Sequence, residues 1–364
     1  MKFRFAIISD PHVAVSQTID YNATRFSVVE ASILALEKVF SHLEQLEIDF
    51  LLLPGDLTQD GELDNHSWLQ QRLGKLPFPA YVVPGNHDVP NLDPTNGRIG
   101  FNQFPHYYHH HGYSQPNQLY YTHEILPGVQ LIGLNSNQFN QQGKQLGCLD
   151  SEQLTWLENL LPQLKEQLIL VMVHHNVIEH LPGQANHELG KRYMLDNANL
   201  LLRMLTNAGC QLIFTGHLHV QDVAYSNNIY EITTGSLVSY PHPYRIIDIE
   251  RQPHGNINLN LNSYRVNQVE GWDNLAEISR QRIGDRSFGF MMKLLTSSPL
   301  DISPAEAEKL VPDLRYFWAD IAHGDNLFDF PHFSASIRSY FEKFGAIKPD
   351  GTPHLIDNRT TLYL

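Results

Sequence analysis

The sequence predicts an α/β protein, chiefly from the order of its apolar segments. In the first 90 residues, short apolar runs at 3–9, 50–53 and 80–83 alternate with helical periodicity at 26–43 and 64–73. Apolar residues at three- and four-residue spacing predict helices, and short apolar runs that end at Pro-Gly predict buried strands. A β-α-β-α-β order is typical of a parallel sheet with helices on its faces.

Length and composition agree with a soluble globular fold. The chain has 364 residues, of which 42% are apolar and 18% charged. These values exclude a disordered, collagen-like or coiled-coil chain, and the length allows two domains.

The middle of the chain continues the pattern and then changes it. Strands are predicted at 129–134, 168–173 and 211–215, with helices that begin at Asp150 and Asn197. Asp150 and Gln153 stand at the spacing of a helix N-cap and its N3 partner. Four closely spaced runs then predict an antiparallel meander, and they are 222–225, 229–234, 244–249 and 257–261.

Two segments lie outside this α/β pattern. Residues 89–128 are rich in Asn, Pro, Gly and aromatic residues, and we expect a long loop or cap insertion there. The composition shifts near Gly271, so we predict a first domain over 1–270 and a helical C-terminal region over 271–364. Ser303-Pro304-Ala305-Glu306 is a strong helix start. This region could cap a cleft, form a dimer or cover an apolar face.

Charge and cysteine content restrict the function. The net charge of −14 argues against passive binding to nucleic acid or to an anionic membrane, although metal ions could still recruit an anionic substrate. Two cysteines cannot form a disulfide framework, whereas 20 histidines favour metal bound by nitrogen and oxygen. No secretory signal or transmembrane run is visible, so we expect a cytoplasmic protein.

Metal-capable side chains follow five of the predicted strands. In parallel α/β sheets the ligand site lies beyond the carboxyl ends of the strands, so these side chains should meet at one edge. They are Asp10 and His12, Asp56, Asn86 with His87 and Asp88, His174, and His217 with His219.

The donor set predicts a dinuclear centre. Carboxylates, imidazoles and one amide suit Mn, Fe or Zn ions with open coordination positions. Seven side chains fill eight ligand positions if one carboxylate bridges, and Asp56, after a tight Pro-Gly turn, is the expected bridge. Two ions about 3.5–4 Å apart can activate water and hold a phosphoryl group during in-line displacement.

The ordered motifs resemble the calcineurin-like metallophosphoesterase superfamily over about residues 1–265. They are Asp10-x-His12, Gly55-Asp56, Gly85-Asn86-His87-Asp88, His174 and Gly216-His217-x-His219. Gly55-Asp56-Leu57-Thr58 and the segment 149–157 are most similar to bacterial class III cyclic-nucleotide phosphodiesterases and the related glycerophosphodiesterases.

The resemblance implies a fold and a role for each motif residue. The fold would be the αββα metallophosphoesterase sandwich, two sheets flanked by helices. Asp56 would bridge two divalent or trivalent ions, His87 would protonate the leaving alkoxide, and Asp88 would orient His87 or the adjacent turn. The first ion would be held by Asp10, His12, Asp56 and His219, and the second by Asp56, Asn86, His174 and His217.

We therefore expect a phosphodiesterase that cleaves a small phosphodiester with a hydroxide that bridges the metal ions. A phosphomonoesterase or nucleotide pyrophosphatase could use the same centre, and a nuclease or a non-catalytic binding module is a weaker alternative. Arginines that flank these motifs in protein phosphatases are absent here, with Arg25, Arg98 and Lys191-Arg192 as candidate substitutes. A small-molecule substrate is the expected partner, and homo-oligomerisation stays open.

Three further groups have an open role. His175 could face substrate or fill the strand end. The run of histidines and tyrosines at 106–111 could stack on a base or form a surface loop. Residues 240–244 could border the site.

Overall fold

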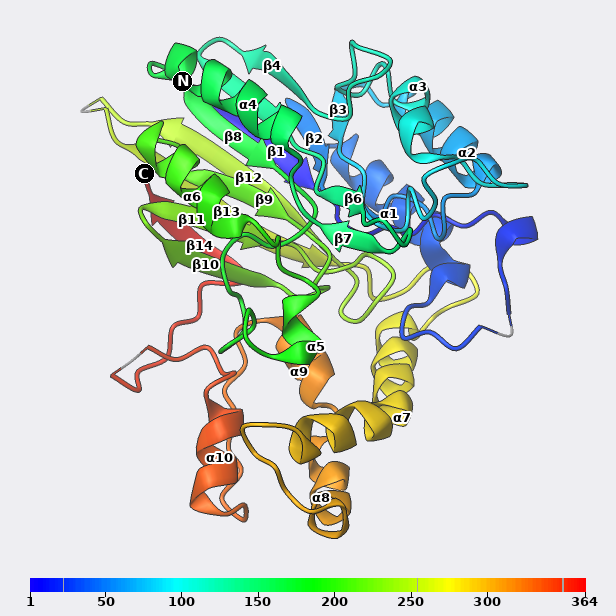
Figure 1. Cartoon of the computed structure of the whole chain (residues 1–364), viewed down its shortest axis with the longest axis vertical. Helices are drawn as coiled ribbons and strands as arrows, with labels where there is room; N and C mark the ends of the chain where they lie inside the picture. Colours follow the sequence, from blue (N-terminus) through cyan, green and yellow to red (C-terminus); the bar gives the residue numbers. More distant parts are fainter. Residues whose placement is uncertain (22, 254, 349) are drawn as a thin grey trace.

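Two facing six-stranded sheets form the centre of the protein (Figure 1), seen in a computed structural model that describes residues 1–21, 23–253, 255–348 and 350–364. The first sheet has the order β14-β13-β12-β1-β2-β3. In it β1, β2 and β3 are parallel, and the remaining pairs are antiparallel. Its strands are β1 (Lys2–Ile7), β2 (Phe50–Leu53), β3 (Ala80–Val82), β12 (Pro243–Arg251), β13 (Ile257–Arg265) and β14 (Arg359–Tyr363).

The second sheet has the order β10-β11-β9-β8-β5-β4. The four inner strands are parallel, and the two edge strands pair antiparallel with their neighbours. Its strands are β4 (Tyr121–Leu126), β5 (Val129–Gly133), β8 (Leu168–Met172), β9 (Leu212–Thr215), β10 (Asp222–Ser226) and β11 (Ile229–Thr233). A small hairpin of β6 (Asn137–Phe139) and β7 (Gln145–Gly147) lies beside the sheets.

Aromatic and aliphatic side chains fill the space between the sheets. Phe5 of β1 stacks on Phe50 of β2 with ring centroids 4.8 Å apart, and Phe214 of β9 meets Phe5 edge-on at 5.5 Å. All three rings are buried. The two inner faces therefore form one apolar core, as the sandwich prediction requires.

Amphipathic helices cover the outer faces. The helices α1 (Ser32–Leu43) and α2 (Leu63–Leu73) pack on the first sheet, and α4 (Ser151–Leu160) and α6 (Ala198–Asn207) pack on the second. Asp150 caps α4 by accepting the Gln153 backbone N–H at 2.7 Å, as predicted. The fold class is thus the two-sheet sandwich with flanking helices.

The segment 89–128 is more ordered than predicted. It holds a 3-10 turn (Phe101–Gln103), the short helix α3 (Phe104–Tyr107) and the edge strand β4. The prediction of a long loop is wrong at its end, because residues 121–126 pair with β5 across a turn at Gly128. Tyr108 is buried, and its hydroxyl lies 2.9 Å from His66 Nδ1.

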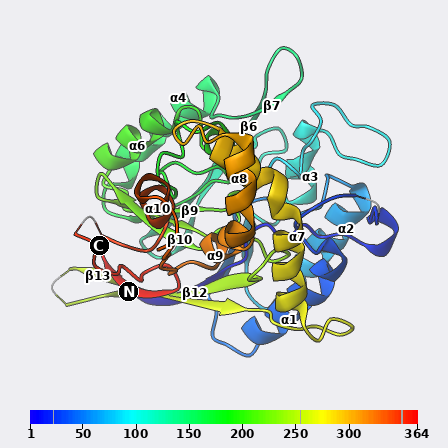
Figure 2. The same cartoon turned by 90° about the horizontal axis from the view of Figure 1, so that it is seen from below.

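Four helices of the C-terminal region lie together beyond one end of the sheets (Figures 1 and 2). They are α7 (Leu275–Thr296), α8 (Pro304–Leu310), α9 (Phe317–His323) and α10 (Ala335–Glu342), and the four-residue α5 (Glu188–Lys191) lies beside them. The helix α7 is continuous through Gly284, where the missing side chain leaves room for the ring of Tyr316. Ser303 caps α8 by accepting the Glu306 N–H, as predicted.

The chain does not end in the helical region. Residues 359–363 form β14, which pairs antiparallel with β13 and returns the C-terminal segment to the first sheet. The prediction of a purely helical region over 271–364 is therefore wrong for residues 359–363. They form a strand because the edge of β13 offers hydrogen-bond partners to their backbone. The domain boundary near residue 270 stays a prediction. In the part of the chain that the structure describes, no helix is long and apolar enough to cross a membrane.

Candidate metal centre

The predicted metal ligands converge from the ends of the parallel strands in both sheets. Five of the seven have a left-handed backbone: Asp10, His12, Asp56, His217 and His219, with φ between 39° and 66°. Such a conformation costs a non-glycine residue about 1–3 kcal/mol, and it persists only where the surrounding structure enforces it. These turns redirect the chain immediately after a strand and aim the side chains at one point.

The first cluster contains Asp10, His12, Asp56 and His219, whose ligand atoms all lie within 4.8 Å of one another. His219 Nε2 lies 3.2 Å from Asp10 Oδ1 and 3.5 Å from His12 Nε2. His12 Nε2 is also 3.8 Å from Asp56 Oδ2. The first predicted ligand set is therefore brought together in full.

The second cluster contains Asp56, His174 and His217, again within 4.8 Å. His174 Nε2 lies 3.4 Å from Asp56 Oδ2 and 3.2 Å from Asn86 Oδ1. Since His217 Nε2 lies 3.3 Å from the carbonyl of Arg192, its Nδ1 is the nitrogen left for a metal ion. Asp56 belongs to both clusters, which is the position predicted for a bridging carboxylate.

The chemistry of these side chains fits a pair of metal ions. Burial, opposed by Asp56, lowers the pKa of His12 to about 3, and burial beside His175 and His174 holds the pKa of His217 well below its usual value. Both rings are therefore neutral, which is the form that binds metal. His12 Nδ1 is buried with no hydrogen-bond partner in the described part of the chain. Two carboxylates facing several imidazoles are a donor set that suits a pair of metal ions.

The carboxylate of Asp56, which both clusters share, forms an ion pair with His174. Burial alone would raise the pKa of Asp56, but His174, His87 and His12 outweigh it and hold that pKa well below the usual value. Burial alone would lower the pKa of His174, and Asp56 instead raises it to about 9. The His174 ring is held in place by its Nδ1, 2.8 Å from the carbonyl of Pro54. Asp56 is thus ionised and ready to bind cations.

Two glycines allow the ligand turns to approach one another. A side chain on Gly85 would collide with the backbone and carboxylate of Asp56, and one on Gly216 would collide with Ser9 Oγ and Asp10 Oδ2. The glycines in the Gly-Asn-His and Gly-His motifs are therefore needed for space around the carboxylates.

Asp88 organises the turns beneath the centre. Its Oδ2 accepts the N–H groups of Leu57 (3.1 Å) and Gly85 (2.8 Å), and its Oδ1 accepts the N–H (2.8 Å) and hydroxyl (3.0 Å) of Thr58. Of the two roles expected for Asp88, the structure therefore shows contacts to the adjacent turns. Burial, reinforced by Asp56, raises the pKa of this carboxyl.

His87 lies beside the metal ligands without joining either cluster. Its backbone N–H donates to Asp56 Oδ1 at 2.8 Å, and its Nδ1 lies 2.8 Å from the carbonyl of Gln59. The ring meets His12 edge-on at 4.8 Å and lines the cavity described next. Burial would lower the pKa of His87, but Asp56 and the Gln59 carbonyl raise it.

A cavity of about 700 Å³ opens from the metal ligands toward the C-terminal helices. His175, Arg25, Arg192 and Tyr240 line it. His175 is also fixed by its Nδ1, 2.7 Å from Ser136 Oγ. His175 and, from the segment 240–244, Tyr240 therefore border the cavity.

Other candidates do not reach this cavity. Arg98 forms an ion pair with Asp60 instead, and Lys191 is not part of the wall. The run at 106–111 is also absent from the wall, and its His111 is buried with Nδ1 3.0 Å from the carbonyl of Ala80. Within that run Tyr108 is also buried, whereas His106, His109 and His110 are exposed.

Sequence analysis left open whether the C-terminal region caps a cleft, and it did not identify the side chains of the opposite cavity wall. Its side chains come from α7, α9 and the segment before α5, and they include Phe290, Leu294, Trp318 and Leu181. The spacing of apolar residues in the C-terminal region predicted helices that each bury one apolar face. This spacing could not show that part of the apolar surface of these helices lines a cavity shared with the metal ligands.

A two-sheet sandwich with one carboxylate shared by two ligand clusters agrees with a metallophosphoesterase. The family model of calcineurin-like phosphoesterases matches residues 3–221, and the chain belongs to this family. This agrees with the resemblance inferred from the motifs.

The related proteins found by sequence comparison share less than a third of their residues with this chain over the aligned part. The chain is 27% identical over 235 residues to a probable glycerophosphodiester phosphodiesterase of Arcobacter nitrofigilis, covering 63% of this chain and 76% of that protein. It is 29% identical over 221 residues to a probable cyclic nucleotide phosphodiesterase of Vesicomyosocius okutanii, covering 60% and 79%. A dimetal phosphatase from Danio rerio shares the fold, with a TM-score of 0.51, 15% identity and coverage of 72% and 96%.

Proposed function

We propose that the protein is a dinuclear metal-dependent phosphodiesterase that hydrolyses a small phosphodiester. The observation that carries this proposal is the position of Asp56, whose carboxylate belongs to both ligand clusters at the floor of the cavity. The names of the two distant relatives, both probable phosphodiesterases, support the same class of substrate. We also propose that the two metal ions are Mn, Fe or Zn. The cytoplasm is the proposed location of the enzyme.

Different side chains have different roles in the proposed mechanism. Bound ions would supply an activated water molecule and neutralise phosphate charge. Asp56 belongs to both ligand sets, and Arg192 offers a cation on the cavity wall, where its guanidinium covers the ring of Tyr193. Water adds to phosphorus, the ester P–O bond breaks, and the products are a phosphomonoester and an alcohol.

His87 acts on the leaving group in this scheme. Since its Nδ1 is occupied by the Gln59 carbonyl, Nε2 is the atom that gives a proton to the departing alkoxide. The ring lies on the cavity wall, next to His12 but outside both clusters, so it can reach substrate without competing for metal.

The test compares bis(4-nitrophenyl) phosphate with 4-nitrophenyl phosphate on protein reconstituted with each metal. We expect metal-dependent preference for the diester, lost in Asp56→Ala and reduced in His87→Ala. His332→Ala is the matched control, because this histidine is exposed in the C-terminal region. Preference for the monoester would instead indicate a phosphomonoesterase, and no metal-dependent turnover of either ester would overturn the proposal.

A further inference from the structure

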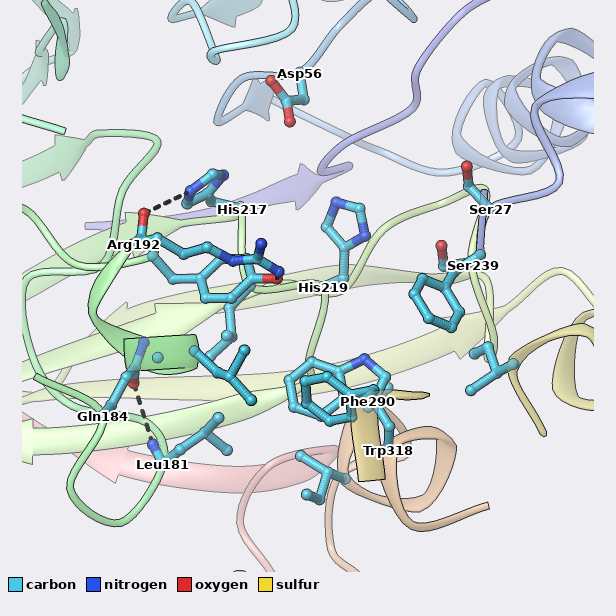
Figure 3. Close-up of a pocket in the computed structure, with 18 of the residues that line it drawn as sticks. Ser27, Asp56, Leu181, Gln184, Arg192, His217, His219, Ser239, Phe290 and Trp318 are labelled. Atoms are coloured by element: carbon cyan, nitrogen blue, oxygen red, sulfur yellow. Dashed lines mark hydrogen bonds between the residues drawn. The ribbon is translucent and has the colours of Figure 1, made fainter. Parts of the chain in front are cut away.

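The cavity is much larger than the phosphate site that its metal ligands define. Its volume of about 700 Å³ lies within the range of roughly 300–1,000 Å³ typical of pockets that enclose a whole organic ligand. Figure 3 shows Asp56, His217 and His219 at one end and Phe290 and Trp318 at the other. A substrate bound through its phosphate would therefore extend toward the C-terminal helices.

The far wall of the cavity is apolar. It is formed by side chains of α7 and α9 and by Tyr340 of α10, and the main ones are Phe290, Leu294, Phe317, Trp318, Ile321 and Tyr340. Phe290 and Trp318 meet edge-on with ring centroids 5.6 Å apart, which fixes the two rings against each other. These helices also share a buried cluster, so the wall is a packed surface rather than a loose cover.

The charged side chains on the cavity wall are mostly cations, and they are Arg25, Lys144 and Arg192. Among the described residues of the wall, Asp56 is the only carboxylate. Arg192 lies along the wall (Figure 3), where its guanidinium covers the ring of Tyr193 at 4.7 Å. No carboxylate in the described part of the chain forms an ion pair with Arg192. The cavity therefore suits an anionic group at one end and an uncharged apolar body at the other.

Polar side chains on the apolar half are mostly engaged within the protein. Gln184 Oε1 accepts the N–H groups of His180 and Leu181, and its Nε2 donates to Asn176. Ser287 donates its hydroxyl to the carbonyl of Gly284 at 2.8 Å. A nucleobase placed there would bury several donors and acceptors without partners, which is costly, whereas an alkyl chain would not.

His187 is a polar residue of the wall that is only partly engaged within the protein. Its Nδ1 accepts the Leu189 N–H, and its Nε2 is buried with no partner in the described part of the chain.

We propose that α7, α9 and α10 bind the apolar chain of the substrate, and that the substrate is an amphiphilic phosphodiester with one alkyl or acyl chain. This inference rests on the proposed phosphodiesterase function and names the class of its substrate. The chain lies against Phe290 and Trp318 while the phosphate lies at the metal ligands.

The experiment is a homologous series of 4-nitrophenyl alkyl phosphates, from methyl to octyl, each used below its micelle concentration with the full-length, metal-loaded protein. Burial of each methylene on the apolar wall should raise kcat/KM by about two- to fourfold. Trp318→Ala and Phe290→Ala should flatten this dependence. Phe288→Ala is the matched control, because this α7 residue is 52% exposed and is not part of the cavity wall.

The possible outcomes are distinct. A kcat/KM that does not change with chain length, a slope kept in both variants, or faster hydrolysis of adenosine 3′,5′-cyclic phosphate than of the octyl ester would overturn the inference. Absence of turnover even for the methyl ester would refute the proposed function instead.

Calorimetric binding of n-octyl phosphate against ethyl phosphate then tests the wall without catalysis. Tighter binding of the octyl compound, lost in Trp318→Ala, supports the inference, and equal binding refutes it.

Discussion

Replacing Asp88 with asparagine tests whether one buried carboxyl holds the metal-binding turns together. Each oxygen of Asp88 accepts two donors, from Leu57 and Gly85 on one side and from the N–H and hydroxyl of Thr58 on the other. An amide has only one oxygen, so one pair of donors must face an NH₂ group. The Thr58 hydroxyl can reverse its role and accept, so the least costly orientation leaves the Thr58 N–H unpaired.

One buried unpaired N–H costs about 1–3 kcal/mol, so we expect Asp88→Asn to lower the free energy of unfolding by that amount. The affected turns carry Asp56 and Asn86, and we therefore also expect metal affinity to fall by about 10- to 100-fold, as for other groups that orient metal ligands. Urea denaturation of the metal-free protein and metal titration measure the two effects separately. Both should be run above neutral pH, where the carboxylate form of Asp88 prevails.

Asp248→Asn is the matched control for this substitution. Asp248 lies on β12 and forms a part-exposed ion pair with Arg4 at 2.7 Å, which contributes less than about 1 kcal/mol. If Asp88→Asn were as stable as the control and bound metal as tightly as the unaltered protein, the account of the turns would be wrong.

Three further predictions concern the proton donor to the leaving group, a buried ion pair, and the close contact of Gly216 with the Asp10 carboxylate. His87→Ala should lower kcat by about 10²- to 10⁴-fold for an alkyl leaving group, less for 4-nitrophenolate, with metal content by atomic absorption unchanged. Burial would lower the pKa of His180, but Glu231 (3.0 Å) and Asp222 (2.6 Å) raise it to about 10. Its stabilisation is therefore complete below about pH 6.5 and lost as pH rises toward 10. His180→Gln should remove that pH dependence from urea melts, and an unchanged pH profile would contradict the assignment. Gly216→Ala should abolish metal binding in a folded protein by circular dichroism, since its methyl group would occupy the space of the Asp10 carboxylate.

Much of the centre could be predicted because its information is local. Each ligand follows a short apolar strand, and parallel strands of one sheet necessarily bring their carboxyl ends to the same edge. Asp56 after Pro54-Gly55 illustrates this, since the residue type and the turn already predicted a bridging carboxylate. The capping residues Asp150 and Ser303 were predictable for the same reason, because a cap depends on a few neighbouring residues.

Features that depend on distant partners could not be predicted in this way. The edge strand β14 needs β13 beside it, and Tyr108 of the run at 106–111 is buried where α2 places His66 beside its hydroxyl. Asp88 was recognised as a supporting residue, but which of its two expected roles it has depends on N–H groups brought from Leu57 and Gly85.

The sequence by itself determined the set of candidate metal ligands, from residue types at strand ends, and the resemblance of these motifs to a known family implied the two-sheet fold. Only the tertiary structure decided what lies opposite those ligands. Phe290 and Trp318 are more than 200 residues from Asp56 in the chain, yet all three line one cavity. The spacing of apolar residues shows that a helix has an apolar face, but whether that face packs tightly or borders a cavity depends on how separate elements pack together.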